Sequence, residues 1–324
     1  MSMIAAESEW ADRRGSGKPV FCADVGGSFM KFAVSPAPGA LVPLEKVATP
    51  AASWDDLAAS LSALIERHQG AGDPESPLAL SIAGLVDPRD GRATSANIPC
   101  ITGRRLVDEL SAMLGRRVLA ANDADCLTLA EANEGAGRGH SVVFCAIMGT
   151  GIGGGLAIDG CLVRGAGGVT GEWGHGPILN TTVEIYGETL HVPRFPCGCG
   201  QSGCVDTIGG ARGIERLHDF LHGCEETSHD ILENWQAGEA RAVKTVAVYL
   251  ELVADPLALA VNVTGASIVP VGGGLASVTP LIDALDQAVR RRILNRFGHP
   301  LVTPALRQDD GGLVGAALLG HQGG

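Results

Sequence analysis

Three cysteines stand close together in the segment CGCGQSGCVD, which covers residues 197–206. Glycines separate Cys197, Cys199 and Cys204 and allow the chain to turn tightly, and His175 lies upstream in the segment GEWGHG. Zinc in a closed structural site takes four thiolate or imidazole ligands in a tetrahedral arrangement. This pattern predicts that His175 and the three cysteines bind a structural Zn²⁺. The alternative is a glycine-rich turn that carries free thiols.

Two carboxylates accompany the predicted zinc ligands. Glu172 lies one helical turn before His175, and Asp206 lies two residues after Cys204. A metal bound here would hold both carboxylates and the imidazole in one small volume. Because four protein ligands leave no open position for a water molecule, we expect this zinc to position residues rather than to activate a nucleophile.

A further group of polar residues follows a predicted strand in the segment AANDADC. A carboxylate at the carboxyl end of a strand is well placed to face a ligand-binding cleft. Phosphoryl transfer to an alcohol needs a group that orients the hydroxyl and accepts its proton. Asp123 suits this role, and Asn122 could offer its amide to a neighbouring hydroxyl. The alternative is that these residues only cap the next helix, and Asp125 is the most dispensable of them for catalysis.

Two glycine-rich turns, DVGGS (24–28) and GTGIGGG (149–155), could bind phosphate, because successive backbone N–H groups form an anion-binding nest. Neither turn has the Walker or the Rossmann spacing, and one such turn alone is as readily an ordinary hairpin. The pair, with a third glycine run at 272–274, favours nucleotide binding. Asp24 could hold Mg²⁺ through water. The residues expected at the nucleotide are Asp24, Gly26, Gly27, Ser28, Gly149, Thr150, Gly151, Gly153, Gly154, Gly273 and Gly274.

Strands and helices alternate in the first half of the chain. The apolar run VFCADV predicts a strand at residues 20–25, and the GGS turn leads into a second strand, FMKFAV. Apolar residues recur at helical spacing from Trp54 to His68. Four further elements are expected: a buried strand at 78–86, a helix at 106–114, a strand at 116–123 and a helix at 126–133.

The second half repeats this arrangement. The segment VVFCAIM predicts a strand at 142–148, GTGIGGG predicts a glycine turn, and LAIDGCLV predicts the returning strand. Residues 241–263 predict a long helix, which Pro256 would break or kink. The segment SIVPVGGG predicts a further strand that ends in glycines. A strand–glycine turn–strand unit therefore occurs twice, which indicates a duplicated α/β fold whose sheets are covered by helices.

Composition narrows the class of protein. A chain of 324 residues suits two lobes, and 45% hydrophobic residues are enough for large cores. The net charge of −12 argues against nucleic-acid binding. Nine cysteines, an odd number with three clustered, fit a reducing cytoplasm. The N-terminal segment lacks an apolar signal core and glycines interrupt the longest apolar stretch, so neither a signal peptide nor a membrane span is expected.

The segments DVGGS, AANDAD, GTGIGGG, GEWGH and CGCGQSGC occur in this order and resemble those of the ROK family of bacterial sugar kinases and repressors. The resemblance extends over the chain from about residue 20. It implies an actin-like (ribonuclease H-like) α/β ATPase fold with two lobes around a central cleft. The expected parts are a flexible leader (1–18), a small N-terminal lobe (19–121) completed by the C-terminal segment 308–324, and a large lobe (122–307) with the zinc motif.

The same resemblance implies an ATP- and Mg²⁺-dependent kinase for the 6-hydroxyl of a hexose. The length of the segment from His175 to Cys197 and the segment LENWQAGEARA are most similar to bacterial N-acetylglucosamine kinases, so N-acetyl-D-glucosamine is the first candidate substrate. In such kinases the ATP phosphates rest on both glycine hairpins, here 22–29 and 149–156, and Asp123 is the catalytic base. A homodimer is also implied. The implied sugar-binding residues are Gly84, Asn97, Asn122, Asp123, Glu172, His175 and Asp206.

Three positions depart from the family pattern. Ser28 and Phe29 stand where threonine and often lysine are usual, Asp206 replaces a glutamate, and SIAGLVDP around Gly84 replaces a glycine–proline turn.

Other functions remain as alternatives to the N-acetylglucosamine kinase. N-acetylmannosamine kinase and glucokinase are the rival enzyme activities. A sugar-sensing repressor would need a helix-turn-helix segment before the first glycine hairpin, where about twenty residues are too few. A sugar-binding protein without catalytic activity is the remaining alternative.

Overall fold

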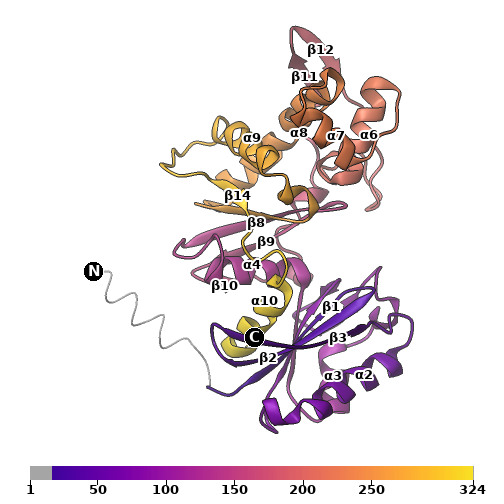
Figure 1. Ribbon diagram of the computed structural model, residues 1–324, viewed down its shortest axis with the longest axis vertical. Helices are drawn as coiled ribbons and strands as arrows, with labels where there is room; N and C mark the ends of the chain where they lie inside the picture. Colours follow the sequence, from indigo (N-terminus) through magenta and orange to yellow (C-terminus); the bar gives the residue numbers. More distant parts are fainter. Residues whose placement is uncertain (1–16, 324) are drawn as a thin grey trace. The chain divides into compact units, whose positions relative to one another are not determined.

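The computed structural model describes residues 17–323, which form two compact units (Figure 1). Unit 1 runs to Ala130 and also contains the segment Arg164–Val169 and the C-terminal segment from Asp309. Unit 2 consists of Glu131–Val163 and Thr170–Gln308. Each unit has its own sheet and its own hydrophobic core. The expected leader, residues 1–18, lies outside the described residues except for its last two.

Unit 1 is built on a five-stranded sheet in the order β3-β2-β1-β4-β7. Its first three strands form an antiparallel meander, and β4 and β7 run parallel to β1. A short ribbon of two strands, β5 and β6, follows β4. The strands are β1 (Val20–Val25), β2 (Phe29–Ala37), β3 (Ala40–Ala48), β4 (Leu78–Ile82), β5 (Leu85–Val86), β6 (Ala93–Thr94) and β7 (Val118–Asn122).

Helices cover both faces of this sheet, because successive side chains of a strand point to opposite faces. On β1, Phe21 packs in the core beneath two helices, α2 and α3, whereas Val20 and Cys22 pack against α10. Figure 1 shows α2 and α3 on one side of the sheet and α10 on the other. The helices are α2 (Trp54–Arg67), α3 (Leu106–Leu114), α4 (Asp123–Glu134), which follows β7 directly, and α10 (Gly311–Gln322).

Unit 2 repeats the strand order of unit 1 in its sheet β10-β9-β8-β13-β14. The antiparallel hairpin of β8 and β9 corresponds to that of β1 and β2, and β13 and β14 run parallel to β8. The predicted duplication is therefore confirmed. The strands are β8 (Val142–Met148), β9 (Ile152–Ile158), β10 (Cys161–Leu162), β13 (Val269–Gly272) and β14 (Val302–Pro304), with a separate hairpin of β11 (Thr182–Ile185) and β12 (Glu188–His191).

A group of helices completes unit 2. The central helix α8 buries Tyr249, whose hydroxyl donates to the backbone oxygen of Gly209 at 2.7 Å. By length and composition α8 alone among the described helices is long and apolar enough to span a membrane, and 56% of its most apolar stretch is buried inside the structure. The helices are α5 (Asp206–Gly209), α6 (Ala211–His222), α7 (Ser228–Gln236), α8 (Ala240–Thr264) and α9 (Thr279–Arg290).

Four predicted elements differ from the structure. The single returning strand expected at LAIDGCLV is two antiparallel strands, β9 and β10, because the chain turns at Asp159 and Gly160, which both have a positive φ. The single strand expected at 78–86 is two strands, because the chain turns at Gly84, where the N–H bonds back to the oxygen of Ile82. The glycine turn after β8 ends at Gly151, and the next glycines already belong to β9. Helix α8 continues through Pro256, which is buried among the apolar side chains of the core, so tertiary packing overrides the local cost of proline.

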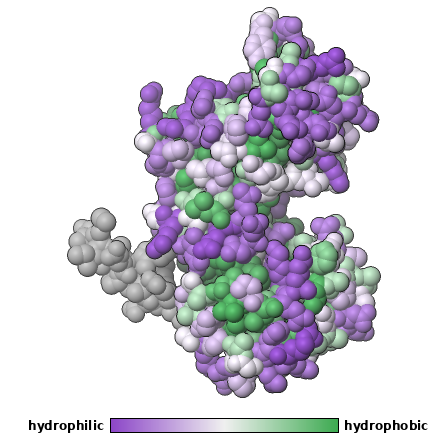
Figure 2. Space-filling model, in the orientation of Figure 1, coloured by the Kyte–Doolittle hydropathy of each residue, from purple (hydrophilic) through white to green (hydrophobic). Residues whose placement is uncertain are grey.

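Polar side chains cover most of the face drawn in Figure 2, and the apolar colour gathers mainly over unit 1.

Candidate functional site

The polar residues predicted for catalysis lie at the carboxyl ends of adjacent parallel strands in unit 1. The register aligns Val25 of β1 with Ile82 of β4, and Ile82 with Asn122 of β7. The turn after β1 and the start of α4 after β7 therefore emerge at the same edge of the sheet. This edge of an open α/β sheet is where such folds bind ligands.

Asp24 is held at this edge by three neighbours. Its Oδ1 accepts a hydrogen bond of 2.8 Å from Ser81 Oγ on β4, and its Oδ2 lies 3.8 Å from Lys31 Nζ on β2. Gly312 at the start of α10 approaches closely, since a Cβ there would lie 2.4 Å from Asp24 Oδ1. The Asp24 side chain keeps 24% of its surface exposed, so its carboxylate can still accept a water of a hydrated Mg²⁺.

Asn122 and Asp123 are predicted either to take part in catalysis or to cap the next helix, and the structure separates these two roles. Asn122 Oδ1 accepts the N–H of Asp125 at 2.9 Å and so caps α4. This leaves the amide group of Asn122 to serve as a donor. Asp123 is exposed, and its Oδ1 accepts the N–H of Ala124 at 2.9 Å. The alternative reading of this segment as a helix cap therefore applies to Asn122, while Asp123 is an exposed residue in the first turn of α4.

The glycines predicted in unit 1 allow close backbone approaches. A Cβ on Gly27 would lie 3.0 Å from the backbone oxygen of Asn97, so the exposed Asn97 sits against the first glycine turn. The turn is closed by a hydrogen bond of 3.0 Å from Gly26 N–H to Phe29 O, and Ser28 is exposed within it. Gly84 has a packing role, because a Cβ there would lie 2.7 Å from Ser95 Cβ.

The second glycine turn, in unit 2, lies beside a third glycine segment. The turn joins β8 to β9, with Gly149 N–H donating to Gly151 O at 3.0 Å and Thr150 exposed at its tip. Gly273 has a φ of 89° and packs against the end of β8, since a Cβ there would lie 2.6 Å from Met148 O. Among the glycines predicted at the nucleotide, Gly149, Gly153 and Gly274 have a Cβ position that opens into free space. Where no Cβ stands in the way, an anion can approach the backbone closely, as an anion-binding turn requires.

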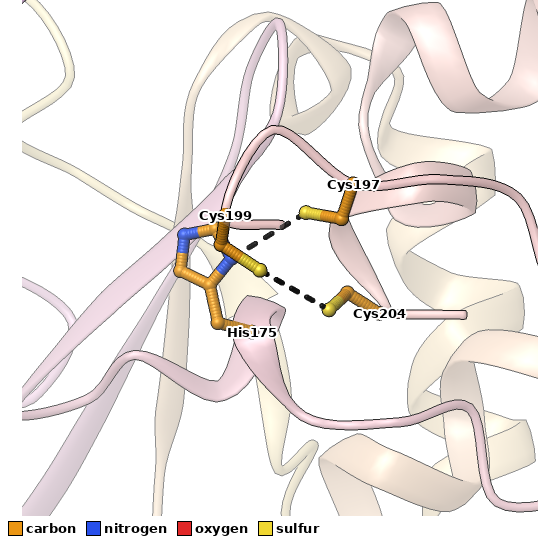
Figure 3. Close-up of side chains that lie close together, drawn as sticks. All are labelled: His175, Cys197, Cys199 and Cys204. Carbon is orange, nitrogen blue, oxygen red and sulfur yellow. Dashed lines mark hydrogen bonds between the residues drawn. The ribbon is translucent and has the colours of Figure 1, made fainter. Parts of the chain in front are cut away.

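The predicted zinc ligands converge in unit 2 (Figure 3). The four ligand atoms of His175, Cys197, Cys199 and Cys204 lie within 4.8 Å of one another. Cys197 Sγ is 3.7 Å from His175 Nδ1, and Cys199 Sγ is 3.7 Å from Cys204 Sγ. In a tetrahedral site with Zn–S bonds of about 2.3 Å, neighbouring sulfurs are about 3.8 Å apart. The donor set and its spacing therefore fit Zn²⁺, with His175 as a ligand through Nδ1.

The protonation of the cluster depends on its surroundings. A backbone N–H of Gln201 bonded to the sulfur lowers the pKa of Cys199 to about 7, while burial raises the pKa of Cys204 to about 12. A bound zinc would hold all three sulfurs as thiolates and would release their protons. His175 Nε2 lies 4.0 Å from Glu172 Oε2, so this carboxylate can orient the ring from the side away from the metal. Burial raises the pKa of Glu172, which His175 opposes and Asp206 reinforces.

Asp206 has a partner that the sequence did not indicate. It begins α5, and its Oδ1 accepts the N–H of Ile152, the first residue of β9, at 2.7 Å. Its Oδ2 lies 3.9 Å from Cys197 Sγ. A Cβ on Gly151 would lie 2.3 Å from Asp206 Oδ1, so only glycine admits the carboxylate at this distance. Asp206 therefore joins the cysteine loop to the second glycine turn.

Two further contacts hold the second glycine turn. Ala211 N–H at the start of α6 donates to Gly149 O at 2.8 Å, and Trp173 Nε1 donates to Gly153 O at 2.8 Å. Sequence reasoning missed Trp173, although it stands inside the GEWGHG segment, and it also missed the Ser81 and Lys31 contacts with Asp24. Ser81 offered a signal, because it is the single polar residue of the buried strand LALSI.

Comparisons with known proteins agree with this arrangement. The sequence model described as the ROK family matches residues 20–323. The chain is 34% identical to an N-acetyl-D-glucosamine kinase of Photobacterium profundum over 91% of this chain and 97% of that protein. It is 32% identical to an N-acetylgalactosamine kinase of Shewanella sp., over 92% of this chain and 95% of that protein.

A solved structure supports the fold. A glucokinase from Streptomyces griseus, determined in complex with glucose and AMPPNP, superposes with a TM-score of 0.69 at 26% identity, and covers 93% of this chain and 98% of that one. The actin-like α/β fold class expected from the sequence is confirmed.

Proposed function

Since this chain belongs to the ROK family, we propose that it is an ATP-dependent sugar kinase that phosphorylates the 6-hydroxyl of an N-acetylated hexosamine, with N-acetyl-D-glucosamine as the first candidate. The names of the relatives, which act on N-acetylated hexosamines, support this substrate class. One observation carries the proposal. An exposed carboxylate, Asp123, stands at the same edge of the unit 1 sheet as the glycine turn beside Asp24. We also propose a cytoplasmic enzyme and, on family resemblance alone, a homodimer.

The chemistry follows from these residues. We assign Asp123 to orient the sugar 6-hydroxyl and to accept its proton as the oxygen attacks the γ-phosphorus of ATP, with ADP as the leaving group. Asn122 would donate from its amide to a neighbouring sugar hydroxyl. Asp24 would hold a Mg²⁺ ion through water, and Mg²⁺ neutralises charge on the phosphates when bound. Backbone N–H groups of the second glycine turn and of the third glycine segment would donate to the phosphates, and the open space at the Cβ positions of Gly149, Gly153 and Gly274 would let the phosphates approach.

In this proposal the zinc site positions sugar-binding residues, and Asp206 positions the second glycine turn. The zinc would fix the segment that carries Glu172 and His175, which we assign to sugar hydroxyls together with Asn97 of unit 1. Gly84 would contribute backbone contacts to the same sugar. Asp206 faces the second glycine turn through Ile152, so we assign it first to positioning that turn and second to the sugar.

A panel of sugars tests the substrate. ADP release with magnesium ATP is measured against N-acetylglucosamine, N-acetylmannosamine, N-acetylgalactosamine, glucose and fructose. We expect the highest kcat/KM with N-acetylglucosamine. A preference for glucose would make the protein a glucokinase, and a preference for another N-acetylated sugar would move the substrate within the proposed class. No turnover with any sugar, from folded zinc-loaded protein, would contradict the kinase assignment.

Replacement of Asp206 separates its two assigned roles. Asp206→Ala removes the acceptor of the Ile152 N–H, and loss of one hydrogen bond to a charged group costs about 1.5–3 kcal/mol. We therefore expect the KM for ATP to rise about tenfold or more, with a smaller change in the KM for the sugar. Asp206→Asn is the matched control, because its amide oxygen can still accept that N–H. A rise confined to the KM for the sugar in both variants would show that Asp206 contacts the sugar instead.

A further inference from the structure

A second group of potential metal ligands lies in unit 2, apart from the residues of the zinc cluster. It consists of His218, Cys224 and Glu226, whose ligand atoms lie within 4.8 Å of one another. His218 stands in the last turns of α6, and the other two residues belong to the short loop that leads from α6 to α7. The segment HDFLHGCEE therefore brings a nitrogen, a sulfur and a carboxylate oxygen to one place by local chain geometry.

His218 is the residue that requires an explanation. Its side chain is fully buried, with 0% of its surface exposed. Its Nδ1 is 3.0 Å from Thr245 Oγ1 on α8, whereas its Nε2 is buried without a hydrogen-bond partner. Buried polar atoms almost always have such a partner, so an exception indicates either strain or a ligand. The unpartnered Nε2 faces the carboxylate of Glu226, whose Oε1 is 3.6 Å away.

This separation fits two ligands of one cation. Zinc binds nitrogen and carboxylate oxygen at about 2.0–2.2 Å, so two such ligands of a tetrahedral ion are about 3.4 Å apart. A direct hydrogen bond between the two atoms would require a distance nearer to about 2.9 Å. Imidazole, thiolate and carboxylate are also the three side-chain types that bind Zn²⁺ in proteins.

The neighbours of the three residues orient them as a metal site would need. The contact with Thr245 suits a ring that is protonated on Nδ1, which leaves the lone pair on Nε2. Asn234 Nδ2 on α7 donates to the second oxygen of Glu226 at 3.2 Å, and the Arg241 guanidinium donates to Cys224 Sγ at 3.8 Å. Hydrogen bonds of this kind fix the direction of metal ligands.

We propose that His218 Nε2, Cys224 Sγ and a carboxylate oxygen of Glu226 form an accessory site for a divalent cation of the zinc type, with water in the fourth position. The site links the end of α6 and the following loop, and through Thr245 it is tied to α8. It shares no ligand with the His175 cluster. The competing reading is a metal-free network in which a protonated His218 pairs with Glu226, and Arg241 pairs with Cys224.

Metal counting distinguishes the two readings without reference to kinase activity. Protein is loaded with Zn²⁺, freed of excess metal by gel filtration and analysed for bound zinc. We expect Cys224→Ser and Glu226→Gln each to bind about one equivalent less than the unmodified protein, since either change removes one of only three protein ligands. His229→Ala is the matched control, because His229, Asp230 and Glu233 form an exposed cluster with no buried ligand. Equal zinc content in Cys224→Ser, Glu226→Gln and the unmodified protein would overturn the proposal.

Cobalt gives a second readout at this site alone. In a background with Cys197, Cys199 and Cys204 all replaced by serine, which removes every thiolate of the first cluster, added Co²⁺ should still produce a thiolate-to-metal absorption band. That band should disappear when Cys224→Ser is added. A band that persists after Cys224→Ser would refute the assigned thiolate. If the protein without the first cluster does not fold, the zinc counts of the single variants decide the question.

Discussion

Replacement of Asp123 by asparagine is expected to lower kcat by about a hundredfold to ten-thousandfold, the range that a general base contributes. Asparagine has the same shape as aspartate and can still accept the Ala124 N–H, but it cannot take the proton from a sugar hydroxyl. The folded structure, the zinc content and the binding of ATP should therefore be unchanged. The measurement is ADP release under saturating sugar and magnesium ATP, with thermal unfolding and metal analysis on the same sample.

Asp125→Asn is the matched control for this experiment. It removes the same charge from the same helix, two residues away, and its own backbone N–H remains bonded to Asn122. We expect its kcat to stay within a few-fold of the unmodified enzyme, a far smaller effect than that expected for Asp123→Asn. If Asp123→Asn kept more than a tenth of the original kcat, Asp123 would not be the base. Equal losses in both variants would point to a general effect of charge at the start of α4.

Loss of the zinc at the His175 cluster is the second large effect that we expect. Cys204→Ser removes a buried ligand, so one equivalent of zinc should be lost, with a clear fall in Tm. Without the metal, the loop loses the link that holds His175 and places Asp206 beside Ile152. Because a misplacement of about 1 Å can cost about a hundredfold in rate, we expect kcat/KM to fall by about that factor.

Cys161→Ser serves as the control for the zinc experiment. Cys161 is also a free cysteine of unit 2, but it is exposed on β10 and lies outside the described metal-ligand clusters. The Cys161→Ser variant should therefore have the same zinc content, Tm and turnover as the unmodified protein. Removal of zinc from the unmodified protein with a selective chelator, followed by an assay with Mg²⁺ restored, should reproduce the Cys204→Ser result. Full activity in a metal-free preparation would show that the metal is dispensable.

Several features could be predicted from the sequence because they depend on residues close together in the chain. The spacing of Cys197, Cys199 and Cys204 brings their sulfurs together within one loop, and His175 supplies the fourth ligand atom of that cluster in the structure. The repeated strand–glycine turn–strand units were visible for the same reason, since hairpins are local. The order of the family segments likewise determined the family and, with it, the expected fold.

Local signals failed where packing opposed them. Pro256 is a helix breaker by its own chemistry, yet α8 continues through it, because apolar contacts along its length hold the helix in place. The glycines at the start of β9 resemble a turn by composition. They are strand residues because they pair with β8, and the backbone of Cys145 and Gly171 leaves no room for a Cβ at Gly154.

Only the tertiary structure decided which polar groups meet across the fold. The sequence identified Asp206 as a carboxylate near the metal, but its hydrogen bond to Ile152 depends on how α5 packs against the second glycine turn. The sequence contains the segment from His218 to Glu226, but the unpartnered nitrogen of His218 becomes evident only once α8 buries that ring. Composition and spacing determine which chemical groups a loop offers. Burial and strand register, which arise from contacts between distant segments, determine which of these groups find partners.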